Sequence, residues 1–354
     1  QSKMFNKFLS YAAASLVLAS CSSTDVLEEN IAAGTAISFN SHVSNSSRAM
    51  TNDNFTSFRV YGGYTLDGQS DYHTSFNSTE VTKTEGTWSY TGGAKYWVKD
   101  ASYKFYAYSC ENTALQKGTP IFATSGDKAG TFEITAFECD DTHQHDFLFA
   151  ESGTIIGKES GNTAVSFTFK HVLSKVCAKF KSGFPAGVNI QVTGVQFRNI
   201  HDRANFSSTL AADERWISHS RTKAYNETTS EYTKTSLDIT GDNTISAAIP
   251  AEGGNAAVEA KDVTTNNGFF IPCTYTAAEV YLCFHIKVTD EDGNTIKDED
   301  IKGNIQPTWK PGVSYTYNIT VNGTAAGLEK IEFTVDATNG ITDWTEQEGG
   351  EIKF

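Results

Sequence analysis

The stretch that decides the fold is VYLCFHIKV, residues 280–288. Every second position, from Val280 to Val288, holds a large apolar side chain, and the positions between them are more polar. Because successive side chains of a strand point to opposite faces of a sheet, this period of two predicts a strand with one buried face. The same alternation occurs at Ile37 and Phe39, at Phe58 and Val60, at Tyr103, Phe105 and Ala107, at Val165, Phe167 and Phe169, at Tyr315, Tyr317, Ile319 and Val321, and at Ile331, Phe333 and Val335.

Turn sequences separate these runs. Asp292-Gly293-Asn294 lies between two apolar runs and suits a hairpin, and residues 66–68 and 91–93 are turn sequences of the same kind. Residues 209–214 are one short helix candidate, but convincing amphipathic helices are scarce. Many strands joined by turns rich in glycine, asparagine and threonine predict an all-β fold made of antiparallel β-sandwiches.

The composition excludes several classes of protein. Of the 354 residues, 39% are hydrophobic and 12% aromatic, which excludes a disordered chain. The 42 acidic and 28 basic side chains give a net charge of −14, whereas nucleic-acid binding requires clustered Lys and Arg. At about 150 residues per domain, the length predicts two domains. No apolar run of about 18 residues follows residue 20, which excludes a multispan membrane protein.

Residues 1–20 have the pattern of a signal peptide, because two lysines precede an apolar run over residues 8–20 that is too short to span a bilayer. Leu18-Ala19-Ser20-Cys21 resembles a bacterial lipobox, whose Cys carries the lipid in the mature protein. We therefore expect lipidation of Cys21, a tether over residues 21–34, and anchoring in the outer membrane through acyl chains alone. An ordinary signal peptide with an incidental Cys is the alternative. Loss of two lysines and no acid gives a mature charge of −14 − 2 = −16, which disfavours docking on anionic lipid.

A polar seam at residues 151–164 divides the rest of the chain. It predicts an N-terminal β-sandwich over residues 35–160 and a C-terminal β-sandwich over residues 161–354. The small-residue stretch NGTAAG, residues 322–327, forms a hinge ahead of the last segment, residues 328–354.

The chain contains no motif that carries chemistry, since the patterns G-x-S-x-G, H-E-x-x-H and the P-loop are all missing from the sequence. His143 and His145 suit a polar turn before a buried strand better than a metal site, and His171 suits a hydrogen-bonded structural role. Residues 290–294, DEDGN, superficially resemble a calcium loop, but the glycine comes too early, so a hairpin turn is the better interpretation. We expect no enzymatic activity, no metal and no cofactor.

The cysteines beyond Cys21 show no C-x-x-C spacing, so neither a zinc site nor a thioredoxin-like motif is supported. Cys177 and Cys283 lie in apolar runs and are predicted to be small core residues. One disulfide among the five remains open, and the sequence does not indicate which. The five are Cys110, Cys139, Cys177, Cys273 and Cys283.

Taken together, the order of the motifs resembles the fimbrillin family, the subunits of type V pili in Gram-negative anaerobes. The resemblance covers nearly the whole chain; single motifs are weak, but their order is specific. After the lipobox they are TAISFN (35–40), SSRA (46–49), FRVY (58–61), KYW (95–97), YKFYAY (103–108), DFLFA (146–150), VSFTFKHVLSKV (165–176), FFIP (269–272), WKPGVSYTY (309–317), IEFTV (331–335) and DW (343–344).

This resemblance implies two transthyretin-like β-sandwiches in tandem and a lipoprotein precursor that matures on the cell surface. An Arg-specific protease cuts after the first strand, that strand leaves, and a donor strand from another pilin subunit fills its groove. Arg48 is the sole Lys or Arg between Cys21 and Phe58 and lies in a polar stretch, so the cut is expected between Arg48 and Ala49. An Arg48 that is never cut is the alternative. Ile37 and Phe39 supply the apolar face of the released strand.

In shaft subunits of the family the donor strand comes from the C-terminus, which here is residues 328–354. The sequence leaves open whether residues 331–335 donate or complete the second sandwich. Position in the shaft, at the anchor or at the tip is also left open. The apolar residues of the expected donor are Ile331, Phe333, Val335, Ile341, Trp344, Ile352 and Phe354.

A different function for the same chain is a monomeric surface lipoprotein that binds a glycan or a host protein. Exposed Trp88, Trp97 and Trp216 would stack on sugar rings in that case, and the alternative is that they pack in the cores of the sheets. The leading hypothesis from the sequence remains a fimbrial subunit that supports cell adhesion.

Overall fold

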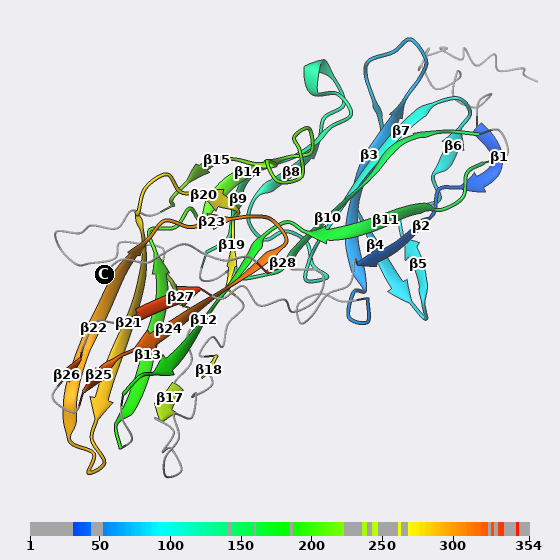
Figure 1. The fold of residues 1–354 in the computed structure, drawn as a ribbon. Coiled ribbons are helices and arrows are strands. Elements are labelled where there is room, and N and C mark those ends of the chain that lie inside the picture. Colours follow the sequence, from blue (N-terminus) through cyan, green and yellow to red (C-terminus); the bar gives the residue numbers. More distant parts are fainter. Residues whose placement is uncertain are drawn as a thin grey trace, which may run out of the picture.

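The structure is a computed structural model that describes residues 31–43, 52–140, 143–158, 161–184, 187–222, 236–238, 243–246, 261–262, 268–324, 327–328, 332–335 and 345–346. In these residues the regular structure is strand, apart from the short 3₁₀ turn Gly126–Lys128. The predicted all-β sandwich fold is confirmed, and Figure 1 shows the strands gathered into two groups along the chain. The candidate helix over residues 209–214 is wrong, since these residues form turns that join the strands Arg203–Ser207 and Trp216–Ser220.

The main sheet of the first sandwich has the strand order β2-β11-β10-β7-β3-β4-β5 in the described part of the chain. All neighbours in it are antiparallel except β2 and β11, which run parallel. The strands are β2 (Phe39–Val43), β3 (Ser57–Thr65), β4 (His73–Thr84), β5 (Thr87–Tyr90), β7 (Ser102–Cys110), β10 (Phe147–Ile156) and β11 (Val165–His171), and β1 (Ile31–Ala36) pairs separately with β6 (Tyr96–Val98).

The main sheet is apolar on both faces. One face surrounds a core that includes Phe39, Phe105, Phe167 and Trp97, all 2% exposed or less. The other face packs against a cover sheet with the strand order β15-β14-β9-β8, and the second core lies between them. The cover strands are β8 (Thr119–Phe122), β9 (Phe132–Glu138), β14 (Arg203–Ser207) and β15 (Trp216–Ser220).

The predicted boundary between residues 160 and 161 does not follow the sheets. It separates β10 from β11, which pair in one sheet through Leu148 with His171 and Phe149 with Lys170. It also assigns β14 and β15 to the second sandwich, although β14 pairs with β9 of the first. The apolar faces of β11 and β14 are buried against first-sandwich residues, and this burial determines where they belong.

The second sandwich packs two sheets around one core that contains Phe180, Phe197, Phe284 and Ile319. One sheet centres on β12 and β24, which pair in parallel, and the other on β13, β21 and β22. Residues 280–288 lie in β21, and the five apolar positions predicted to face inward are all buried. The strands are β12 (Ser174–Ser182), β13 (Asn189–Arg198), β16 (Ser236–Asp238), β17 (Asn243–Ser246), β18 (Lys261–Asp262), β19 (Phe269–Phe270), β20 (Cys273–Thr274), β21 (Val280–Thr289), β22 (Thr295–Ile305), β23 (Thr308–Trp309), β24 (Val313–Val321), β25 (Gly323–Thr324), β26 (Gly327–Leu328), β27 (Glu332–Val335) and β28 (Thr345–Glu346).

Candidate functional site at the edge of the first sandwich

Strand β2 lies at one edge of the main sheet. Its five residues pair with β11 alone among the described strands, from Phe39 opposite Val165 to Val43 opposite Phe169. The Val165 N–H also donates to the Ser38 carbonyl oxygen at 2.8 Å. Loss of β2 would therefore break one ladder of the main sheet and leave the rest of that sheet paired, and departure of the whole N-terminal segment would also break the ladder of β1 with β6.

The apolar side chains of residues 37–43, which comprise β2 and the two residues before it, nonetheless belong to the core. Ile37, Phe39 and Val43 are each 2% exposed or less, whereas Asn40 faces solvent. The ring of Phe39 lies near four other rings, with centroid distances of 5.1 to 5.9 Å. The predicted alternation of residues 37–40 is thus confirmed, and removal of β2 would open a hydrophobic groove. The rings around Phe39 are those of Phe76, Tyr90, Phe105 and Phe167.

Side-chain and backbone groups of the rest of the sandwich form hydrogen bonds with both ends of the segment 37–43. At its start, the Tyr90 hydroxyl donates to the Ile37 carbonyl oxygen at 2.8 Å, and the Ile37 N–H donates to the Lys95 carbonyl oxygen at 2.7 Å. At its end, Asn52 Oδ1 accepts from the Val43 N–H at 2.7 Å, and Asn52 Nδ2 donates to the Val43 carbonyl oxygen at 3.0 Å.

The two edges of the main sheet, β2 and β5, approach each other without pairing, and a hollow remains between them. This seam cavity has a volume of about 280 Å³. Its walls include Ile37 and Phe39 on one side and Val81, Trp88 and Tyr90 on the other. Backbone groups on the free side of β2 therefore border a largely apolar hollow, where an extended segment would find both hydrogen bonds and apolar contacts.

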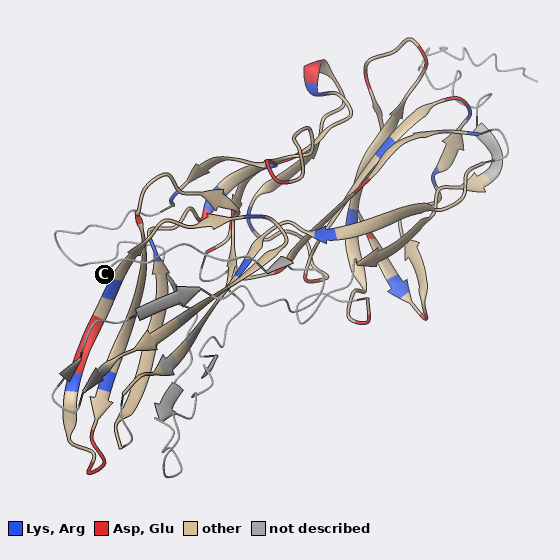
Figure 2. Ribbon diagram, viewed as in Figure 1, with Lys and Arg blue, Asp and Glu red and all other residues tan. Residues whose placement is uncertain are grey.

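Another edge strand, β22, differs sharply from β2. Residues 297–302 read KDEDIK, and the acidic run on β22 flanked by basic residues is visible in Figure 2. His285 of β21 contacts two of these carboxylates, Asp298 and Asp300, each at 2.9 Å. Charged side chains on an edge oppose the addition of another strand. The uncharged β2 edge is therefore the better candidate for strand addition.

The predicted lipidation and cleavage sites lie outside the described residues. These are Cys21, Arg48 and Ala49. The nearest described positions on either side of the cleavage site are Val43, at the end of β2, and Asn52. A cut within residues 44–51 would thus separate β2 from the body of the sandwich.

The predicted donor segment is described in part. Phe333 and Val335 lie in β27, which pairs antiparallel with β24 through Ile319 opposite Phe333 and Tyr317 opposite Val335. In this chain β27 therefore completes its own second sandwich, the alternative that the sequence left open, and donation would require it to leave β24. The other predicted donor residues, Ile331, Ile341, Trp344, Ile352 and Phe354, lie outside the described residues.

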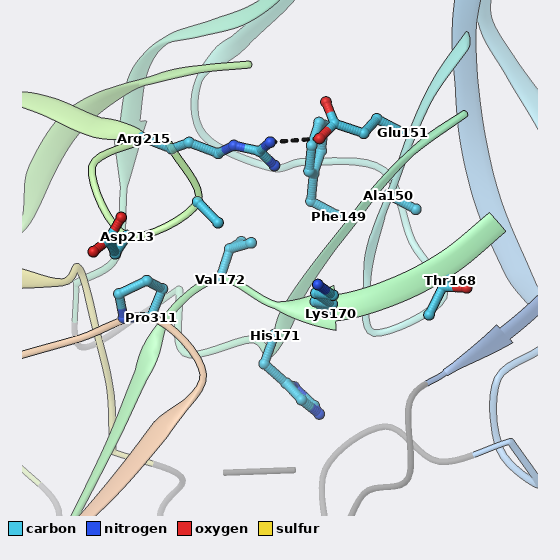
Figure 3. Close-up of a pocket in the computed structure, with 11 residues that line it drawn as sticks. Phe149, Ala150, Glu151, Thr168, Lys170, His171, Val172, Asp213, Arg215 and Pro311 are labelled. Atoms are coloured by element: carbon cyan, nitrogen blue, oxygen red, sulfur yellow. Dashed lines mark hydrogen bonds and ion pairs between the residues drawn. The ribbon is translucent and has the colours of Figure 1, made fainter. Parts of the chain in front are cut away.

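A larger cavity, of about 400 Å³, lies beside β10 and β11. Figure 3 shows Arg215 and Glu151 pointing toward each other at its rim, and their side chains form an ion pair at 2.6 Å. The Arg215 guanidinium also lies 5.0 Å from the centre of the Phe149 ring. Because Arg215 covers that ring, the cavity presents no open aromatic face on which a sugar could stack.

Trp88, Trp97 and Trp216 do not provide an exposed glycan-binding surface either. Trp97 is 0% exposed and Trp216 is 6% exposed, so for both the alternative that these rings pack in the cores of the sheets is confirmed. Trp88 is partly buried, and its ring contacts Phe55 and Phe58. These rings pack on the apolar faces of the sheets, because burying their large apolar area is more favourable than leaving it in water.

The histidines considered in the sequence have separate carboxylate partners. His143 Nδ1 lies 2.7 Å from Asp140, and His145 Nδ1 lies 3.0 Å from Glu111. His171 and Asp146 form a buried pair at 2.9 Å, which confirms the hydrogen-bonded structural role predicted for His171. Among the residues that the structure describes, no three His, Cys, Asp or Glu side chains are arranged to hold a metal ion.

Among the cysteines beyond Cys21, burial makes Cys110 and Cys139 poor nucleophiles. Burial raises the pKa of Cys110 to about 12, and burial also raises the pKa of Cys139. Cys283 is buried as predicted, but Cys177 is only partly buried, because the strand alternation turns its neighbours Val176 and Ala178 inward instead. None of the five forms a disulfide.

One histidine–cysteine contact has a consequence for stability. His201 Nδ1 lies 3.2 Å from Cys273 Sγ, and its ring stacks on Tyr275 at a centroid distance of 5.0 Å. The pKa of His201 is lowered from 6.5 to about 4, chiefly by burial and then by the Arg221 guanidinium and His219, against smaller opposing effects of Glu279 and Asp202. Burial also raises the pKa of Cys273 to about 11. Neutral imidazole beside a protonated thiol is thus the arrangement near neutral pH.

We expect His201 to make the free energy of unfolding depend on pH. Between pH 6.5 and 4 the unfolded chain binds a proton at residue 201 that the folded chain does not, so stability is full above pH 6.5 and falls as the pH is lowered toward 4. His201→Asn should flatten this slope, measured by urea unfolding at several pH values. The change is about 1–2 kcal/mol over the window, since solvent screening reduces the full value. His73→Asn, at an exposed histidine, is the control; equal slopes in wild type and His201→Asn would contradict the expectation.

Sequence reasoning missed Asn52 and Tyr90. Asn52 belongs to a polar stretch that was interpreted as an exposed loop, and Tyr90 to a short strand with no distinguishing pattern. Their roles depend on contacts with Val43 and Ile37, which are 9 and 53 residues away in the chain. No local spacing indicates such pairs.

Comparison with known proteins agrees with the resemblance seen in the sequence. A family model described as fimbrillin-like matches residues 47–344. A search of the curated proteins finds no match. No helix in the described part of the chain has the length and apolar character needed to cross a membrane.

One solved structure of a fimbrial protein has a similar fold, and two others are matched along most of their length. A fimbrial protein from Bacteroides vulgatus is 19% identical, with a TM-score of 0.57, and the match covers 84% of this chain and 98% of that one. A candidate cell adhesion protein from Bacteroides ovatus is 16% identical, with a TM-score of 0.47 and coverage of 89% and 99%. The fimbrial anchor protein Mfa2 from Porphyromonas gingivalis is 10% identical, with a TM-score of 0.32 and coverage of 86% and 98%.

Proposed function

The chain belongs to the fimbrillin-like family, and on that premise we propose that it is a structural subunit of a type V pilus that polymerises by strand exchange and supports cell adhesion. The lipidated precursor reaches the outer membrane as a closed monomer, an Arg-specific protease cuts after Arg48, and β2 leaves the first sandwich. A donor strand from a neighbouring subunit then replaces it. The protein acts as a structural subunit and not as an enzyme.

The observation that carries this proposal is the position of β2: an edge strand, uncharged along its edge, whose apolar side chains are buried. Burial of Ile37, Phe39 and Val43 contributes roughly 2 kcal/mol each, so release of the segment through β2 forfeits about 6 kcal/mol together with the β2–β11 and β1–β6 ladders of hydrogen bonds. An incoming strand with alternating apolar residues recovers both contributions. The subunit is then most stable when another subunit fills its edge.

The C-terminal segment, residues 328–354, is the proposed donor. Its described part includes β27, which is itself an outer strand of its sheet and pairs with β24 alone among the described strands. One subunit would thus release a strand at the edge of the first sandwich and donate a segment from the edge of the second. Cys21 would hold the precursor in the outer membrane through acyl chains, at about 0.8 kcal/mol for each buried methylene.

Substitution of Arg48 tests the maturation step. In surface material sheared from cells, wild-type subunits are expected to begin at Ala49, and Arg48→Ala subunits are expected to keep the acylated N-terminus at Cys21. Filament yield should fall at least tenfold, because uncut β2 stays covalently attached next to its groove. Mass spectrometry of the N-terminal peptide and electron microscopy of the sheared fraction provide the two measurements.

The matched control is Arg48→Lys, which keeps the positive charge but removes the side chain that an Arg-specific protease selects. Both variants should block the cut. Normal processing of Arg48→Lys would show that the protease accepts any basic residue, and normal processing of Arg48→Ala would rule out Arg48 as the site.

A further inference from the structure

A cut within residues 44–51 would remove the covalent link between β2 and the body, but the hydrogen bonds at both ends of the segment would remain. We propose that Asn52 and Tyr90 form a two-ended clamp that keeps the cleaved segment 37–43 on the first sandwich. The arrival of an exchanging strand, and not the cut, then determines when the edge is uncovered. This inference rests on the proposed release of β2 and adds a step that controls it.

The clamp at the end of β2 is made by a single side chain. The Asn52 amide accepts the Val43 N–H at 2.7 Å and donates to the Val43 carbonyl oxygen at 3.0 Å, so it satisfies both backbone groups as a neighbouring strand would. Asn52 follows the cut and Val43 precedes it. After cleavage these two hydrogen bonds therefore join the departing piece to the body.

The clamp at the start of the segment crosses the seam. Tyr90 lies on β5, at the opposite edge of the main sheet from β2. Its hydroxyl donates to the Ile37 carbonyl oxygen at 2.8 Å and accepts the Lys95 N–H at 3.2 Å. Its ring packs against Phe39 and Phe76, at centroid distances of 5.9 and 5.1 Å. Since β2 and β5 do not pair through their backbones, the Tyr90 hydroxyl provides a polar link between the two edges.

The two ends are where such a clamp has most effect. The cleaved piece is held by two ladders, β1 with β6 and β2 with β11, and it frays first at Val43, the end next to the cut, because an end residue breaks fewer interactions than a central one. Asn52 restrains this end, and Tyr90 restrains the junction between β1 and β2 at Ile37. While the hydrogen bonds of both Asn52 and Tyr90 are intact, release of the cleaved piece requires several interactions to break at the same time. An incoming strand that displaces β2 one residue at a time is then the faster route.

The test measures how fast the cut segment leaves. In the full chain, residues 44–51 are replaced by a recognition sequence for a highly specific protease, so that cutting does not depend on Arg48. A fluorophore on the N-terminal piece then reports its dissociation after the cut, in the presence of excess unlabelled piece. Each of Asn52→Ala and Tyr90→Phe should speed dissociation roughly threefold to tenfold, and the double variant by about the product of the two.

Asn77→Ala is the matched control, since this residue is exposed on β4 and should leave the rate unchanged. Hydrogen exchange at the Ile37 and Val43 amides of the uncut chain gives a second measurement that does not depend on cleavage, and both amides should exchange faster in the variants. Equal dissociation and exchange rates in wild type and both clamp variants would overturn the proposal.

The outcomes separate the clamp from the proposed function. Faster dissociation in the variants, with no filaments from the mature wild-type chain, would support the clamp and contradict polymerisation by strand exchange. Filament formation with unchanged dissociation rates would support strand exchange and overturn the clamp.

Discussion

Replacing Phe39 with Ala is expected to lower the free energy of unfolding of the uncleaved chain by about 3–5 kcal/mol, the usual cost of removing a buried phenylalanine. Phe39 is 2% exposed and its ring lies within 6 Å of four other rings, so the substitution leaves a cavity that few neighbours can fill. Urea unfolding of the purified precursor, followed by tryptophan fluorescence, measures the change. Asn40→Ala, one residue away on the solvent face of β2, is the control and should change stability by less than about 0.5 kcal/mol.

The same substitution should have no effect on the finished filament. If the cut falls after Arg48 and β2 leaves, residue 39 is no longer part of the mature subunit, and filaments from wild type and Phe39→Ala have the same composition. Their resistance to thermal dissociation should then be equal, even though the precursors differ in stability. Retention of peptide 37–43 in purified filaments, or a less stable filament from Phe39→Ala, would contradict the release of β2.

Phe39→Ala should also accelerate assembly. A weakened β2 is displaced more easily, whereas the donor that replaces it is unchanged. The expected pattern is a less stable precursor, faster polymerisation and an unaltered product. A substitution that simply damages the fold would instead slow assembly and reduce the yield, so the three measurements together distinguish the two cases.

The sequence predicts which faces of the strands are buried far better than which strands are neighbours. The alternation at residues 165–169 and 280–288 follows from the geometry of a single strand, and the structure buries the expected side chains. The parallel pairing of β2 with β11 joins residues more than 120 positions apart, and no local pattern contains that information. The face of a strand is a property of its own residues, but its partner is set by the packing of the whole sandwich.

The misplaced domain boundary has the same origin. Residues 151–164 are polar and contain turn residues, yet the chain returns afterwards to the first sandwich, since β11 completes its main sheet and β14 completes its cover sheet. Polarity marks where the chain reaches the surface and does not tell which core it enters next. Asn52 was hidden for a similar reason, because an amide that clamps a strand end has the same sequence context as one in a solvated loop.

Removing residues 341–354 is expected to reduce polymerisation at least a hundredfold while leaving the folded monomer intact. The segment contains Ile341, Trp344, Ile352 and Phe354, and burial of such side chains in a neighbouring groove contributes roughly 2 kcal/mol each, well above what a hundredfold change requires. Its described pairing within the monomer is the short contact of β28 with Val313 and Ser314 of β24. Since this contact lies in the second sandwich, the first sandwich should keep its free energy of unfolding within about 0.5 kcal/mol.

Mixing the truncated chain with full-length subunits gives a second test of the donor. A subunit that lacks its donor can still accept one, so it should add to a growing end and stop further growth, and filament length should fall as the truncated fraction rises. Gln347→Ala with Glu348→Ala, two polar changes inside the segment, is the matched control and should leave filament length unchanged. If the truncated chain polymerises at the wild-type rate, the donor does not lie in residues 341–354. The remaining donor candidate is then β27 with Phe333 and Val335, whose departure would open the second sandwich at β24 and lower its stability during assembly.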